Sequence, residues 1–291
     1  MWRTFFATAA FLYLFFIGVS LGMLGPIPSF EQLENPSNNL ASEIYSSDQE
    51  LLGKFYVENR TNVEYQQLSP FLVQALIATE DIRFEKHSGV DARGIFRVIV
   101  KTIAGGNRSS GGGSTITQQL AKNLYERPKD ISKLEIVSIK FREWVTAIKL
   151  ERNYTKEEII AMYLNTVDFG SQSFGIKSAA KTYFDKSPDS LNIQESAMLV
   201  GMLQAPSKYN PVRNPDNAMK RRFVVMSQMA KYGFITMEQL DSLKDLPLST
   251  GKFKLQDHKS GMATYFREYL RKIMNETKPE RSDYPNDEEY Q

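Results

Sequence analysis

Two neighbouring segments carry most of the information in this chain: Glu80-Asp81-Ile-Arg-Phe84-Glu-Lys-His87-Ser-Gly89 and Gly113-Ser114-Thr-Ile-Thr-Gln118-Gln119-Leu-Ala-Lys122-Asn123. The first places a carboxylate pair directly after an apolar helical run. Apolar neighbours make a carboxylate a better proton acceptor, as a general base requires. The second is a glycine-rich loop that leads into a helix whose amides, hydroxyls and lysine suit a diphosphate. Together the segments predict a group transfer with a phosphate leaving group.

Each segment also has an ordinary structural interpretation. Glu80 could be a helix-end glutamate paired with Arg83 or Lys86, and the run Ser109–Ser114 could be a flexible connector. Against the second alternative, Lys122 follows Gln118 by one helical turn, so both lie on one helix face. The loop lacks the Gly-Lys-Ser/Thr ending of a nucleotide P-loop.

The amino-acid composition limits the kinds of functional site that the chain can form. The 291 residues suffice for one sizeable domain with accessory segments, and a net charge of +2 gives no electrostatic case for nucleic acid. The chain has no cysteine, and its only histidines are His87 and His258. Disulfides, thiolate zinc sites and multi-histidine metal sites are therefore excluded or disfavoured. The chemistry must rest on carboxylates, amides and cations, and the sequence requires no cofactor.

The N-terminal segment is apolar. Thr4 to Gly25 carries no charge, and about 20 such residues span a bilayer core. This predicts a retained single transmembrane helix within residues 1–25, with a cleaved signal peptide as the alternative. Arg3 precedes the run and the next lysine is Lys54, so the N-terminus is expected in the cytoplasm and the rest outside.

The remainder divides into a linker, a body and a tail. Residues 26–42 read as a linker, and residues 43–246 as a mainly α domain that starts with a small β-hairpin around Ser47-Asp48-Gln49. Helix starts are predicted at Ser69-Pro70 and at the capping boxes of Thr155, Asn192 and Thr236. Gly233 is expected to end the helix that begins near Pro215. Residues 247–291 read as a polar linker toward a further, missing transpeptidase domain.

One predicted helix, Gly94 to Ala104, is apolar except for Arg97 and Lys101. These two cations stand four residues apart and form one basic stripe. A wide apolar surface beside such a stripe suits a lobe that dips into an anionic membrane. An ordinary buried helix is the alternative.

The combined motifs resemble glycosyltransferase family 51, the peptidoglycan glycosyltransferases, which occur alone or as the first domain of class A penicillin-binding proteins. Beside the two opening segments, Lys140-Phe-Arg-Glu143 resembles the R-K-x-x-E motif of the family. Tyr163-Leu-Asn165 with Gly170 and Gly175 resembles Y-L-N…G…G, and Arg221-Arg222-x-x-Val225 resembles R-R-x-x-V. The resemblance covers about Glu43 to Leu240. Two positions depart from the pattern: Ile139 replaces a phosphate-binding cation, and Ala161 replaces a frequent glutamate.

The resemblance implies a lysozyme-like glycosyltransferase domain behind the membrane anchor. It implies that lipid II is polymerised into glycan strands with inversion and release of undecaprenyl diphosphate. Glu80 would be the general base, and Glu143 would assist the leaving diphosphate or organise its cations. Asp81 and His87 would hold the loop, and Tyr163, Asn165, Arg221 and Arg222 would belong to the scaffold or second shell. The residues expected to bind sugar and diphosphate are Ser114, Gln118, Gln119, Lys122, Lys140 and Arg142.

The expected partners are lipid II, the growing glycan strand, the lipid bilayer and other cell-wall synthesis proteins. Some members of the family respond to a divalent cation, Mg²⁺ or Mn²⁺, although no metal site can be recognised in this sequence. The resemblance places the protein in the bacterial cytoplasmic (inner) membrane as a single-pass protein, with its catalytic domain extracytoplasmic.

Two other classes of function remain open. A lytic enzyme with two carboxylates could cleave glycosidic bonds, but its neutral leaving group would not need the amides and lysines of the Gln118–Lys140 region. A non-catalytic membrane scaffold could bind glycan, but Glu80 and Glu143 both weigh against it. Ser178-Ala-Ala-Lys181 matches the S-x-x-K of transpeptidases, yet no K-T-G follows and too little chain remains for that fold.

Overall fold

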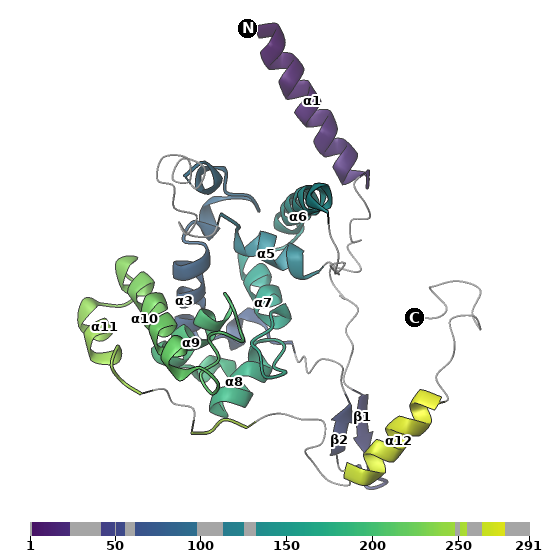
Figure 1. Ribbon diagram of the computed structural model, residues 1–291, viewed down its shortest axis with the longest axis vertical. Helices are drawn as coiled ribbons and strands as arrows, with labels where there is room; N and C mark the ends of the chain where they lie inside the picture. Colours follow the sequence, from purple (N-terminus) through teal and green to yellow (C-terminus); the bar gives the residue numbers. More distant parts are fainter. Residues whose placement is uncertain are drawn as a thin grey trace. The chain divides into compact units, whose positions relative to one another are not determined.

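The computed structural model describes residues 2–23, 42–49, 51–55, 62–97, 113–124, 132–247, 251–254 and 264–276. The chain divides into two compact units. The larger unit comprises Met1–Asn38 and Asn59–Leu255, and the smaller comprises Asn39–Glu58 and Gln256–Gln291. The described parts are mainly helical (Figure 1), so the predicted mainly α class is confirmed.

The larger unit contains nearly all of the helices described. Its α-helices are α1 (Trp2–Ser20), α3 (Pro70–Glu80), α5 (Ile116–Asn123), α6 (Lys133–Asn153), α7 (Lys156–Thr166), α8 (Ile176–Phe184), α9 (Ile193–Met202), α10 (Pro215–Lys231) and α11 (Met237–Leu243). Residues 92–97 are also helical. Short 3₁₀ turns occur at η1 (Tyr65–Gln67), η2 (Phe84–Lys86) and η3 (Pro188–Ser190).

Capping boxes set the starts of many of these helices. Thr155, Asn192 and Thr236 form the predicted boxes at α7, α9 and α11. Two further boxes start α5 at Thr115 and α6 at Ser132. In each box the cap and the third residue of the helix satisfy one another's backbone N–H, so helix ends are fixed by local sequence.

Two groups of helices meet in one core. Helices α3, α9 and α10 pack against one another, while α5 packs against α6 and α7. Leu72 and Leu76 of α3, Leu120 of α5 and Val225 of α10 are fully buried members of the same apolar cluster. Burying these side chains removes apolar surface from water and stabilises the packing of segments far apart in sequence.

The smaller unit contains β1 (Ser42–Tyr45), β2 (Leu51–Phe55) and α12 (Thr264–Glu276). The strands are antiparallel, with Ser42 opposite Phe55, on either side of the predicted turn at Ser47–Gln49. Helix α12 falls within residues 247–291, which the sequence suggested to be an irregular linker. Phe266, Tyr269 and Ile273 stand at helical spacing. The linker prediction rested on the polar composition of the segment and did not take this short pattern into account.

Within the described residues, no helix combines the length and the apolar character needed to cross a bilayer. The membrane anchor predicted within residues 1–25 stays a prediction. The helix at this place is α1, which begins before Arg3 and ends at Ser20. Its end is followed by Gly22 at a φ of 89°, a conformation that stops a right-handed helix.

Two other predictions reach beyond what the structure describes. The predicted membrane-facing helix Gly94–Ala104 is described only as far as residue 97. Most of the first linker and residues 277–291 also lie outside the described residues.

Candidate active site

A cavity of about 1020 Å³ opens between segments of α3, α5, α6 and α10. Most of the residues predicted for catalysis and substrate binding line it. They are Glu80, Ser114, Gln118, Gln119, Lys122 and Lys140. Glu143 and Arg142, the other two predicted site residues, are not among its lining residues.

Glu80 is the last residue of α3 and stands at the cavity wall. The preceding turns of α3 bury Ala75, Leu76 and Ala78, which fixes the helix and hence the position of Glu80. Its Oε2 accepts a hydrogen bond of 2.9 Å from Nε2 of Gln119. The alternative ion pair with Arg83 is absent, because that side chain lies 3.4 Å from Asp91 instead.

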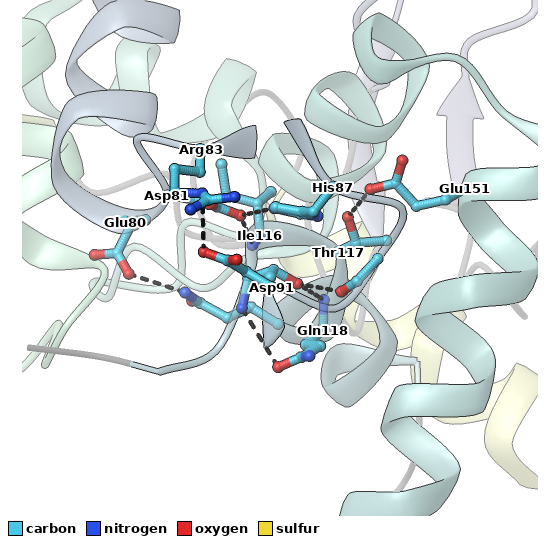
Figure 2. Close-up of polar contacts among 12 residues, drawn as sticks. Glu80, Asp81, Arg83, His87, Asp91, Ile116, Thr117, Gln118 and Glu151 are labelled. Carbon is cyan, nitrogen blue, oxygen red and sulfur yellow. Dashed lines mark hydrogen bonds and ion pairs between the residues drawn. The ribbon is translucent and has the colours of Figure 1, made fainter. Parts of the chain in front are cut away.

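Asp81 has a different task from its neighbour. Its Oδ2 lies 2.9 Å from His87 Nε2 and accepts a 3.2 Å hydrogen bond from the backbone N–H of Ile116. Figure 2 shows the carboxylate of Glu80 turned away from this group. Asp81 thereby joins the loop of residues 81–89 to the start of α5, which agrees with the predicted loop-holding role.

The start of α5 differs from the expected phosphate cradle. Asp81 accepts the N–H of Ile116, and the side chain of Thr115 accepts the N–H of Gln118 at 3.1 Å. A carboxylate at a helix N-terminus is favoured by the exposed N–H groups and the helix dipole, so the protein itself satisfies these donors. Sequence reasoning missed this because the carboxylate comes from a residue 35 positions away.

Gln118 lies buried at the cavity wall. Its side chain is 1% exposed, and Oε1 accepts a 3.4 Å bond from the backbone of Thr115. Its Nε2 is buried and has no acceptor among the residues described. A buried donor without an acceptor costs free energy, and an oxygen-rich ligand in the cavity would relieve that cost.

Glu143 and Lys140 form a tight pair on α6. The side chain of Glu143 is 0% exposed, and its Oε2 lies 2.6 Å from Lys140 Nζ. The same ammonium donates to Ser114 Oγ at 3.3 Å. Glu143 therefore reaches the cavity through Lys140, whose own side chain is 43% exposed.

The two departures from the family pattern are buried. Ile139 is 8% exposed and Ala161 is also 8% exposed. Both positions contribute to packing in this chain.

Several residues assigned to the scaffold do serve it. Asn165 bonds both the N–H and the C=O of Val63, at 3.1 and 2.9 Å. A Cβ at Gly175 would lie 2.7 Å from the carbonyl oxygen of Asn165, so only glycine fits there. The buried Arg222 donates to the carbonyls of Lys244, Leu246 and Pro247 at the end of α11.

Sequence reasoning missed the part of the cavity wall that α10 contributes. Arg221 had been assigned to the scaffold, and Val224, Gln228 and Lys231 had not been singled out, yet all line the cavity. Their spacing of three, four and three residues places them on one helix face. That spacing was visible in the sequence, but nothing indicated which face of the helix would meet a site.

No group of acidic or histidine side chains suited to hold a metal ion occurs among the residues that the structure describes.

The profile of the family described as Transglycosylase matches residues 48–230. The chain belongs to this family, which confirms the resemblance found from the motifs. Penicillin-binding protein 1A of Escherichia coli (strain K12) is 38% identical over 75% of this chain and 25% of its own length. Penicillin-binding protein 1A of Aquifex aeolicus is 35% identical over 80% of this chain and 32% of its own length.

A crystal structure of penicillin-binding protein 1A from Haemophilus influenzae is similar with a TM-score of 0.47 and 23% identity. The match covers 85% of this chain and 25% of that one. The chain thus spans about a quarter to a third of the length of these relatives.

Proposed function

We propose that this protein is a peptidoglycan glycosyltransferase that polymerises lipid II into glycan strands and releases undecaprenyl diphosphate with inversion. One observation carries the proposal: the carboxylate of Glu80 and the cations Lys122 and Lys140 line the same cavity. A base that activates an alcohol and cations that receive a departing diphosphate must act on one substrate pair at the same time.

In the proposed reaction Glu80 takes the proton from the 4-hydroxyl of the N-acetylglucosamine of one lipid II. The freed oxygen attacks the anomeric carbon of the growing strand, and the bond from this carbon to the diphosphate oxygen breaks. The electron pair leaves with the undecaprenyl diphosphate. Lys140, Lys122 and the Nε2 group of Gln118 stabilise its charge, while Ser114 contributes a hydroxyl beside Lys140.

Glu143 acts through Lys140 in this proposal. Because its side chain is 0% exposed and contacts Lys140 Nζ at 2.6 Å, it holds the ammonium beside Ser114 without contacting the substrate. Of the two roles that the resemblance left open for Glu143, its burial therefore favours the organisation of cations.

The lytic alternative explains less of the cavity. Its leaving group is a neutral sugar hydroxyl, and it would gain nothing from Lys122 and Lys140. A non-catalytic scaffold would not need a carboxylate held by an amide at the cavity wall.

Because the proposed substrate is lipid-linked, the reaction belongs at the outer face of the bacterial cytoplasmic membrane. The bilayer, the glycan strand and other cell-wall synthesis proteins are the proposed partners. A divalent cation, Mg²⁺ or Mn²⁺, would supply further positive charge to the leaving diphosphate, although the described residues form no group suited to hold it.

The test supplies labelled lipid II to the purified protein and follows the polymer. Glu80→Gln should lower kcat by about 10² to 10⁴-fold, the usual contribution of a general base, and Glu143→Gln should lower it less. Moenomycin should inhibit the wild type. Glu85→Gln is the matched control, since Glu85 is exposed and does not line the cavity.

Other outcomes decide against the proposal. Soluble fragments released from finished peptidoglycan would support the lytic alternative. Binding of lipid II without turnover by the wild type would support the scaffold.

A further inference from the structure

Gln119 was expected to bind substrate, but both ends of its amide are engaged by the protein. Its Nε2 donates to Glu80 Oε2 at 2.9 Å, and its Oε1 accepts from the hydroxyl of Tyr163 at 3.0 Å. Through these two hydrogen bonds, Tyr163 of α7 is connected by Gln119 of α5 to Glu80, the last residue of α3. One N–H and one lone pair of the amide are thereby committed to the protein, and one of each remains.

We propose that Gln119 is a positioning residue for Glu80, and that Tyr163 fixes which end of the Gln119 amide faces the carboxylate. The inference rests on the proposed function and deepens it. It concerns how the base is held and adds no new contact to the substrate.

The orientation of the amide is the central point. A glutamine side chain has a donor and an acceptor end of nearly equal shape. With the acceptor end toward Glu80, two oxygens with negative charge density would meet and repel. The hydroxyl of Tyr163 donates to Oε1 and thereby leaves only the NH₂ group for Glu80.

Tyr163 is suited to remain a donor. Its side chain is buried, and this burial, together with the charge of Glu80, raises the pKa of the phenol well above its usual range. The hydroxyl therefore keeps its proton at neutral pH and remains a hydrogen-bond donor. A buried phenol also has little freedom to leave the amide.

As a consequence, the two carboxylate oxygens of Glu80 differ in their hydrogen bonds. Oε2 is occupied by Gln119, whereas Oε1 accepts no hydrogen bond from the residues described. The arrangement leaves Oε1 available for the proton of the substrate and restricts rotation of the carboxylate. A base held in one orientation loses less entropy when it reacts.

A tyrosine at another place in the core provides a matched control. Tyr183 is 0% exposed, its hydroxyl donates to the carbonyl of Phe169 at 3.0 Å, and Asn210 donates to it at 3.1 Å. Neither Tyr183 nor these partners line the cavity. Tyr183→Phe and Tyr163→Phe each remove one buried hydroxyl and differ in the connection to Glu80.

The experiment measures kcat, KM for lipid II and Tm. Tyr163→Phe should lower kcat about tenfold, the factor of one lost hydrogen bond, with KM unchanged. Both substitutions should lower Tm to a similar extent, by about 3 °C. Tyr183→Phe, however, should leave kcat unchanged. An equal kcat for the wild type and Tyr163→Phe, or an equal loss in both tyrosine variants, would overturn the inference.

A double-mutant cycle tests whether Tyr163 acts through Gln119. Gln119→Leu should lower kcat without raising KM, and adding Tyr163→Phe to it should cause no further loss of kcat. A raised KM in Gln119→Leu would return Gln119 to substrate binding. If Tyr163→Phe does not fold, the single variant Gln119→Leu still decides the matter through KM and kcat.

Failure of the inference can be separated from failure of the proposed function. If Glu80→Gln polymerises lipid II like the wild type, the proposed base is wrong. If Glu80→Gln is inactive while Tyr163→Phe keeps the kcat of the wild type, only the positioning inference is wrong.

Discussion

Glu80 and Asp81 are adjacent carboxylates with opposite tasks, and the end of α3 explains the difference. Asp81 follows the helix with a φ of −156°, so its side chain leaves the direction that Glu80 keeps. Asp81 then meets His87 and Ile116, while Glu80 stays at the cavity wall. In this dipeptide, Glu80 therefore belongs to the candidate site, and Asp81 belongs to the structure that supports it.

Gly89 is required by both its conformation and its surroundings. Its φ is 92°, and a Cβ there would lie 2.7 Å from the carbonyl carbon and oxygen of Ala147 in α6. We expect Gly89→Ala to lower the free energy of unfolding by about 3 kcal/mol or more, through backbone strain and the clash with α6. Urea unfolding measures the loss.

Gly233 allows the cost of backbone strain to be measured without a steric clash. Its φ is 78°, but a Cβ would meet nothing within 4 Å. Gly233→Ala should therefore lose only the strain, about 1 kcal/mol. Equal losses in the two variants would show that contact with α6 contributes nothing at Gly89.

At the scale of elements, the start of α7 couples a cap to pH. The backbone N–H of Thr155 bonds the carboxylate of Glu158 at 2.7 Å, and this bond is the main cause that lowers the pKa of Glu158 from 4.5. A lowered pKa in the folded state means that the charged form stabilises the fold. The contribution is complete above the unfolded value of 4.5 and is lost as the pH falls through the lower folded value.

Two variants test this cap by thermal unfolding from pH 7 down to about pH 2, through the lowered pKa of Glu158. Glu158→Gln keeps an acceptor for the N–H and removes the charge, so its loss of Tm should be present at pH 7 and should shrink toward acid pH. Thr155→Ala removes the hydroxyl cap and should cost about 1 kcal/mol at pH 7. A Glu158→Gln deficit that grows as the pH falls would contradict the assigned sign.

The elements show why part of the fold was readable from the sequence. The boxes at Thr155, Asn192 and Thr236 are local signatures, and the same S/T-x-x-E/Q spacing at Ser132 and Thr115 could have been found in advance. Asp81 capping α5 could not, because this contact depends on how α3 and α5 pack.

The candidate site, too, was predictable from the sequence only in part. Motifs found six of the lining residues, including Glu80 and Lys140, because these residues recur in a recognised order. They did not show that Glu143 is fully buried or that Gln119 is engaged at both ends. Such facts depend on side-chain directions in the folded chain, which spacing does not determine.

For the molecule as a whole, charge is nearly balanced at +2, yet the cavity gathers cations. Lys122 and Lys140 come from α5 and α6, and Arg221 and Lys231 from α10. Of the lining acids, Asp91 lies against Arg83, which offsets its charge. The larger unit therefore attracts anions locally, without a field over its whole surface.

This local field predicts that inorganic diphosphate binds the cavity and stabilises the fold. At about ten times its dissociation constant, diphosphate should raise Tm by about 3 °C, because it binds the folded state alone. Added NaCl should reduce the shift by screening. Lys140→Gln should remove most of it, since the substitution deletes the ammonium beside Ser114.

Lys181→Gln is the matched control for this measurement. Lys181 is a partly exposed lysine of α8 that pairs with Asp185 and does not line the cavity. It should keep the full diphosphate shift, and inorganic sulfate should give a smaller one in both proteins. Equal shifts in Lys140→Gln and Lys181→Gln would mean that diphosphate binds elsewhere, and the assignment of Lys140 to the leaving group would then be wrong.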